Sequence, residues 1–102
     1  MPDLKLRAVL FQEEGWWVAQ CLEFDVAAQA RTQADVVYEL ERILVGRFLV
    51  SAEKRCEPFA GVPPAPRRYW TMFEQAEPVP LEAVPVRQGA FEILPDIKLR
   101  AA

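Results

Sequence analysis

The chain has 102 residues, with 12 Lys and Arg against 15 Asp and Glu, and a formal net charge of −3. This length suits one domain with a single core, and the acidic balance argues against a dedicated nucleic-acid binder, so direct nucleic-acid binding is not expected. The uninterrupted apolar runs are too short to span a bilayer and the first residues begin no signal peptide, so we expect a cytoplasmic protein with no membrane partner.

The residue types that are missing limit the chemistry. The sequence has no histidine, no asparagine and one serine, Ser51. Histidine-based acid–base catalysis, Ser-His-Asp and Cys-His arrangements and His-containing zinc sites are therefore excluded. The four glycines are isolated, so no phosphate-binding loop is present. We expect no enzyme, no catalytic or metal-binding residue and no cofactor. Cys21 and Cys56 lack ligand-like spacing; two reduced thiols are favoured over a bridge.

Three strands are predicted in the first third of the chain. Residues 4–11 alternate with a period of two: one face of the predicted strand is wholly apolar, and the other carries both charged and apolar residues. This pattern is typical of a half-buried strand. Residues 12–15 form a polar connection of hairpin length that ends in Gly15. Residues 16–22 are apolar on both faces, which favours a central strand with Gln20 as its polar exception. Residues 26–30 form a shorter third strand.

A helix is predicted over residues 33–50. Thr32 is placed to cap its first turn, and Asp35 lies near the positive end of its dipole. Apolar residues recur every three or four positions and form one stripe: Val36, Val37, Leu40, Ile43, Leu44 and Phe48.

The second half of the chain contains a proline-rich segment and two weaker elements. Residues 57–66 are too irregular for a strand, and Pro66 is well placed to begin a short helix over residues 67–76. The prolines of residues 77–86 argue against a central strand there. A last strand is predicted over residues 90–94, or as far as Leu99.

A short sequence echo links the two ends of the chain. Residues 2–8 (PDLKLRA) return as residues 95–101 (PDIKLRA). The match is too short for a repeat architecture. The favoured interpretation is that two amphipathic strand ends have similar sequences. The alternative is that the two termini are neighbours in one sheet, or pair across a dimer.

Residues 16–44 resemble the HicB-like antitoxin superfamily. Its members show an aromatic-Val-Ala-acid-Cys strand, a short loop and a Gln-Gly-Asp-Thr stretch before an acidic helix. The counterparts here are residues 17–21 (WVAQC), 23–25 (EFD) and 29–32 (QART), with Ala30 and Arg31 in place of the family's glycine and aspartate. Residues 81–94 resemble the closing strand of that fold, and residues 57–76 resemble an insertion of a proline segment and a short helix.

The resemblance implies an α+β fold. Its β-β-β-α-β unit is a truncated RNase-H-like layer of sheet with one helix across it, and the last strand lies parallel beside the first. It also implies a non-enzymatic protein-binding module that neutralises a small HicA-type mRNA interferase. The chain after Leu94 is too short for a DNA-binding domain, so a solitary member is expected. The alternatives are a divergent Mg-dependent nuclease-like enzyme, and a structural oligomer with lapsed antitoxin activity.

Spare apolar surface predicts self-association as a dimer or higher homo-oligomer. Trp16 and Trp17 point to opposite sides of one strand, so at most one of them enters the helix-covered core. Residues 67–70 (RRYW) combine two arginines with two aromatic residues. A helix that is anchored by its aromatic residues and has solvated arginines is favoured over a site that stacks on RNA and neutralises it. The candidate interface residues are Trp16, Tyr38, Val45, Leu49, Tyr69, Trp70 and Phe73.

Overall fold

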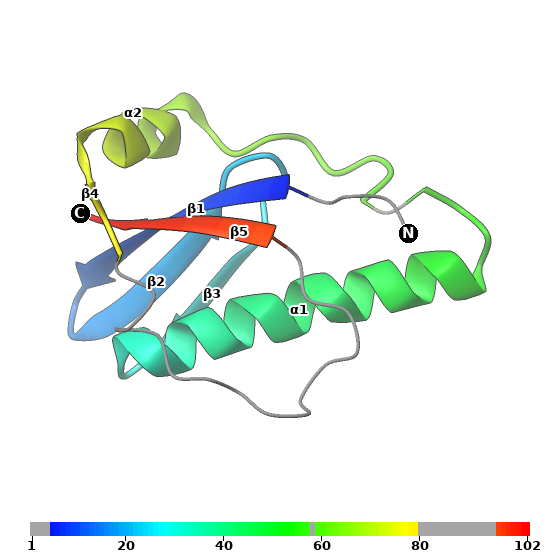
Figure 1. The fold of residues 1–102 in the computed structure, drawn as a ribbon, viewed down its shortest axis with the longest axis horizontal. Helices are drawn as coiled ribbons and strands as arrows, with labels where there is room; N and C mark the ends of the chain where they lie inside the picture. Colours follow the sequence, from blue (N-terminus) through cyan, green and yellow to red (C-terminus); the bar gives the residue numbers. More distant parts are fainter. Residues whose placement is uncertain (1–4, 58, 80–95) are drawn as a thin grey trace.

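The residues that the structure describes form a five-stranded mixed sheet and two helices (Figure 1). The computed structural model describes residues 5–57, 59–79 and 96–102. In chain order its elements are β1 (Lys5–Glu13), β2 (Trp16–Cys21), β3 (Ala27–Ala30), α1 (Gln33–Glu53), α2 (Arg67–Gln75), β4 (Glu77–Pro78) and β5 (Asp96–Ala101). The strand order is β3-β2-β1-β5-β4, with β5 parallel to β1 and the other pairs antiparallel. The α+β class and the three early strands are confirmed.

The β1–β2 hairpin is tighter than expected. Gln12 and Glu13 belong to β1, so the connection is only Glu14 and Gly15, with φ of 51° and 81°. Positive φ at both central residues is the property of a type I′ turn, whose twist matches that of the flanking strands. Gly15 takes this conformation without strain, whereas Glu14 adopts it at some cost.

The two ends of the chain are neighbours in the sheet, which confirms the second interpretation of the sequence echo. β5 pairs with β1 in parallel register, with Ala8 opposite Leu99 and Arg7 opposite Lys98. The echoed residues within the two strands, 5–8 and 98–101, are two positions out of register, which keeps each on the same face of the sheet as its counterpart. The strand expected over residues 90–94 lies outside the described residues. β4, with Pro78, is a two-residue edge strand.

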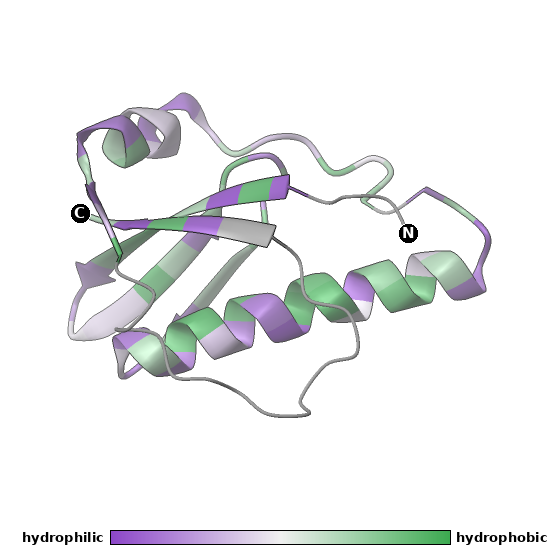
Figure 2. Cartoon of the chain, viewed as in Figure 1, coloured by the Kyte–Doolittle hydropathy of each residue, from purple (hydrophilic) through white to green (hydrophobic). Residues whose placement is uncertain are grey.

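α1 covers one face of the sheet, and all of the predicted stripe except Phe48 packs in the core there. Figure 2 shows hydrophobic and hydrophilic bands along α1. Thr32 caps it, because the Thr32 Oγ1 atom accepts a hydrogen bond of 3.1 Å from the Asp35 N–H. The helix continues three residues beyond the predicted end at Val50. No described helix has the length and apolarity to cross a bilayer. The core between α1 and the sheet contains Leu6, Ala8, Leu10, Ala19, Cys21, Val26, Ala28, Val36, Val37, Leu40, Leu44 and Phe59.

α2 packs on the opposite face, so the expected two-layer arrangement holds only in part. Val9 alternates with Ala8 and Leu10 along β1, and it is buried with Phe73 of α2 in a second cluster. Leu22, Ala65 and Ala76 complete the buried part of this cluster. The physical reason is that β1 and β2 present apolar side chains on both faces. The proline-rich segment brings the chain across, where the Ala65 N–H donates to the Leu22 carbonyl at 2.9 Å.

Candidate interaction surfaces

The aromatic candidates of α2 lie against the chain's own sheet. Phe73 is buried, and the Tyr69 ring stacks on Phe11 at 5.9 Å between ring centroids. The Trp70 indole N–H donates to the Ala65 carbonyl at 3.1 Å. Tyr69 and Trp70 keep partial exposure, so they offer only their outer edges to a partner.

The two neighbouring tryptophans separate as expected. Trp17 packs against the core beneath α1, and Trp16 lies on the other face of β2. The Arg31 guanidinium lies 3.7 Å from the centroid of the Trp16 ring, a cation–π contact. Arg31 stands where the resembled family has aspartate, and this contact gives it a structural role. Trp16 is therefore half-buried by a cation from its own chain.

The candidates on α1 divide between buried and exposed positions. Val45 is buried, Tyr38 is half-buried, and Leu49 is 51% exposed. Val50 is 49% exposed, and with Leu49 it forms the pair of exposed large hydrophobic residues in the described part of the chain. Sequence reasoning missed Val50 because it stood at the predicted helix end; the signal was an apolar residue next to Leu49. Consecutive helical residues project about 100° apart, so the two side chains face different directions.

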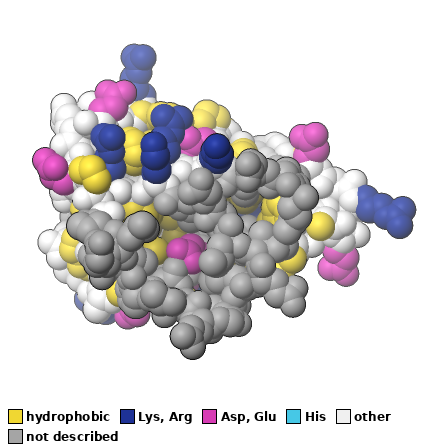
Figure 3. All heavy atoms as spheres, in the orientation of Figure 1, with side chains coloured by type: hydrophobic (Ala, Val, Ile, Leu, Met, Phe, Trp, Pro, Cys, Tyr) yellow, Lys and Arg dark blue, Asp and Glu magenta, His cyan; other side chains and the backbone are white. Residues whose placement is uncertain are grey.

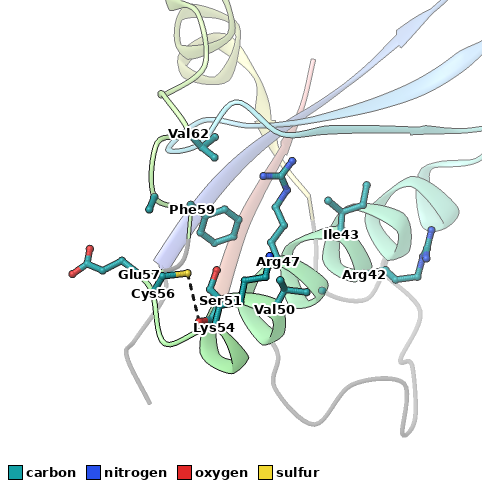
Figure 4. A pocket seen from close by; sticks show the side chains of 12 residues that line it. Arg42, Ile43, Arg47, Val50, Ser51, Lys54, Cys56, Glu57, Phe59 and Val62 are labelled. Atoms are coloured by element: carbon teal, nitrogen blue, oxygen red, sulfur yellow. Dashed lines mark hydrogen bonds between the residues drawn. The ribbon is translucent and has the colours of Figure 1, made fainter.

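An open groove runs between the C-terminal half of α1 and the loop that follows it. Its volume is about 550 Å³. Figure 4 shows Phe59 and Val62 on the loop side, Ile43 and Val50 on the helix, and Arg47 rising between them. We call this space the α1 groove. Its lining residues are Arg42, Ile43, Gly46, Arg47, Val50, Ser51, Lys54, Cys56, Glu57, Phe59, Ala60 and Val62.

The wall and floor of the α1 groove are built by specific local interactions. Phe59 adopts a φ of 60° and its ring stacks on Phe24 with centroids 4.3 Å apart, which ties the loop to the β2–β3 connection. Gly46 lies in the helix interior, and a Cβ built on it meets no described atom within 4 Å. The groove thus has room at a point where helix propensity favours alanine over glycine.

The charges around the α1 groove are mainly positive. Arg42 is paired with Glu39 at 2.8 Å, whereas in the described part of the chain no ion pair involves Arg47 or Lys54. Glu57 is the acidic residue of the lining. An apolar floor with a cationic rim suits a protein segment that presents apolar side chains and carboxylates.

The segment that resembles the HicB-like motif is held by a buried amide. Gln20 is 4% exposed, and its Nε2 atom donates to the Cys21 carbonyl and the Asp25 Oδ1 atom, both at 3.0 Å. Nε2 also lies 3.4 Å from the Val26 carbonyl. Buried polar groups cost stability unless they are hydrogen-bonded, so Gln20 fixes the β2–β3 connection.

The thiols are free and differ in environment. Cys21 is buried in the core, and this desolvation raises the pKa of its thiol. Cys56 is exposed in the loop that follows α1, where its Sγ atom lies 3.7 Å from the Ser51 carbonyl. Within residues 5–57, 59–79 and 96–102, no three or more Cys, Asp or Glu side chains are grouped to hold a metal ion.

Comparison of the chain with protein-family models, with curated proteins and with solved structures finds no match. The resemblance to the HicB-like superfamily therefore rests on the sequence motifs.

Proposed function

We propose that this protein is a non-enzymatic, cytoplasmic protein-binding module of the HicB type, which assembles as a homo-oligomer and neutralises a small HicA-type mRNA interferase. The observation that carries the protein-binding part is the α1 groove, with its apolar floor and the half-exposed Val50 at its side. Exposed apolar surface next to an open groove is a common property of association sites.

A second copy of this chain is the occupant that we assign to the α1 groove. The chain has more Asp and Glu than Lys and Arg, and the groove rim carries Arg47 and Lys54. Opposite charges at the rim of an interface favour association and fix its register. β3 offers additional support, because no described strand pairs with its outer edge and its sequence AAQA lacks the charges and prolines that protect edges.

The toxin part of the proposal is supported by the order of elements and by net charge. β2 and the β3–α1 junction contain the residues that resemble the family motif, 17–21 and 29–32. A chain of net charge −3 attracts a small basic protein, and this attraction raises the rate of encounter.

Co-expression with a HicA-type toxin encoded beside this gene tests the toxin part. The expected result is a complex that survives gel filtration at physiological salt, together with loss of the toxin's RNA cleavage. An unrelated small basic protein of similar charge is the control for non-specific attraction. Full RNA cleavage in the presence of excess chain contradicts the proposal.

A further inference from the structure

Basic side chains gather on the sheet face opposite α1, along β1 and β5. Arg7 and Lys98 are direct register partners, and Arg100 lies opposite Val9, which is buried on the α2 side. Alternation along β1 places Lys5 on the same face as Arg7. Figure 3 shows Lys and Arg side chains in a row over these two strands.

Arg7 and Lys98 place two positive charges side by side, and in the described part of the chain only Arg7 has an acidic partner, Glu23. Like charges on neighbouring positions of one sheet face repel each other. The chain as a whole has an excess of acidic residues, so a gathering of cations here is not a consequence of composition. Lys98 is exposed, and no described residue forms an ion pair or hydrogen bond with its ammonium group.

Arg7 is held in a fixed position. Glu23 accepts from the Arg7 backbone N–H at 2.7 Å through Oε1 and from Nε at 2.6 Å through Oε2. The Arg7 guanidinium lies 4.6 Å from the Trp70 ring centroid, and Trp70 is itself anchored to Ala65. These contacts leave both Nη groups of Arg7 without an acceptor among the described residues. A cation that is oriented before a ligand arrives binds it at lower entropic cost.

A pocket of about 340 Å³ lies at this position, and we call it the basic pocket. Its described lining is Lys5, Leu6, Arg7, Glu23 and Lys98, so three cations face one carboxylate there. The register partner of Lys5 is the acidic Asp96, and with both acidic residues counted the cations remain in excess by one. We propose that the basic pocket binds a phosphate dianion, either inorganic phosphate or the terminal phosphate of a small phosphomonoester. Arg7 supplies a planar pair of donors and Lys98 a point charge, which are the two side-chain types that recognise phosphate.

The test is an amide NMR titration of the full chain with inorganic phosphate, with sodium chloride added to hold ionic strength constant. We expect saturable shifts at Arg7, at Lys98 and at the indole N–H of Trp70. Glycerol 3-phosphate is expected to produce the same shifts, because its terminal group is also a dianion. Shifts that do not saturate, or that are spread over the molecule, overturn the proposal.

Substitutions separate the site from general charge effects. Lys98→Gln is expected to weaken phosphate binding about five- to tenfold, the loss of one charge-assisted contact. Arg55→Gln removes the same charge beyond the end of α1, at an exposed residue outside the linings of the α1 groove and the basic pocket, and is expected to leave phosphate binding unchanged. Equal weakening by the two variants refutes the site. Dispersed amide spectra of both variants confirm that they are folded.

Two further measurements distinguish phosphate binding from nucleic-acid binding and from self-association. A single-stranded RNA oligonucleotide without terminal phosphates presents only monoanionic diesters, and it is expected to bind more weakly than phosphate. Tighter binding of the oligonucleotide overturns the phosphate assignment in favour of a nucleic-acid surface. Val50→Asp, which alters the α1 groove, is expected to bind phosphate normally, so failure of the self-association proposal leaves this one standing.

Discussion

Replacement of Gly46 by alanine is expected to stabilise the protein. Gly46 lies in the interior of the 21-residue helix α1, and an added Cβ meets no described atom within 4 Å. Glycine costs about 0.8–1.0 kcal/mol relative to alanine at an interior helix position. With no clash to offset this gain, the free energy of unfolding should rise by about 1 kcal/mol, which raises the Tm of a domain of this size by about 4–8 °C.

Urea and thermal unfolding at low protein concentration measure this change on the dissociated chain. Arg47→Gly is the matched control, because it places glycine at the next, exposed position and is expected to lower stability by a similar amount. Destabilisation by Gly46→Ala would show that something packs closely against Gly46, and the description of the α1 groove as open space would then be refuted.

Four other predictions concern the core, the cap of α1, the β1–β2 turn and the two thiols. Leu44→Ala removes a side chain that is 1% exposed in the α1 core and is expected to cost about 2–5 kcal/mol in urea unfolding; a smaller loss means that the helix face is misassigned. Thr32→Ala removes the cap of α1 and should cost about 1 kcal/mol, whereas an unchanged midpoint contradicts the capping role. Glu14→Asn should raise the unfolding midpoint, because asparagine tolerates the positive φ of this turn better; a lowered midpoint counts against the turn type. At pH 8 a thiol reagent should label Cys56 alone in the native protein, since burial and a raised pKa protect Cys21, and two adducts without denaturant contradict this.

The strands and α1 could be predicted because their signals are local. Alternation along β1 and the three-and-four spacing of the α1 stripe each lie within one short segment. The Thr32 cap is equally local, since donor and acceptor are three residues apart. Such patterns specify an element and its buried face before any tertiary contact forms.

The placement of α2 could not be predicted, because its nine residues indicate an apolar side without indicating which sheet face receives it. That choice depends on Val9 and Leu22, and apolar residues at these two positions are typical of any strand near the centre of a sheet. The basic pocket is also non-local, since Arg7 and Lys98 come from opposite ends of the chain. The Arg31–Trp16 contact depends on β2–β3 register, which composition does not determine.

Sedimentation equilibrium over a range of concentrations tests the central claim most directly, namely that the surface of α1 serves association. The wild-type chain is expected to form a homo-oligomer. Val50→Asp, which places a carboxylate beside the apolar floor of the α1 groove, is expected to remain monomeric. Ala52→Asp adds the same charge to an exposed position of α1 outside the groove and should associate as the wild type does. A wild-type chain that stays monomeric at all concentrations, or an unchanged oligomer of Val50→Asp, would contradict the account.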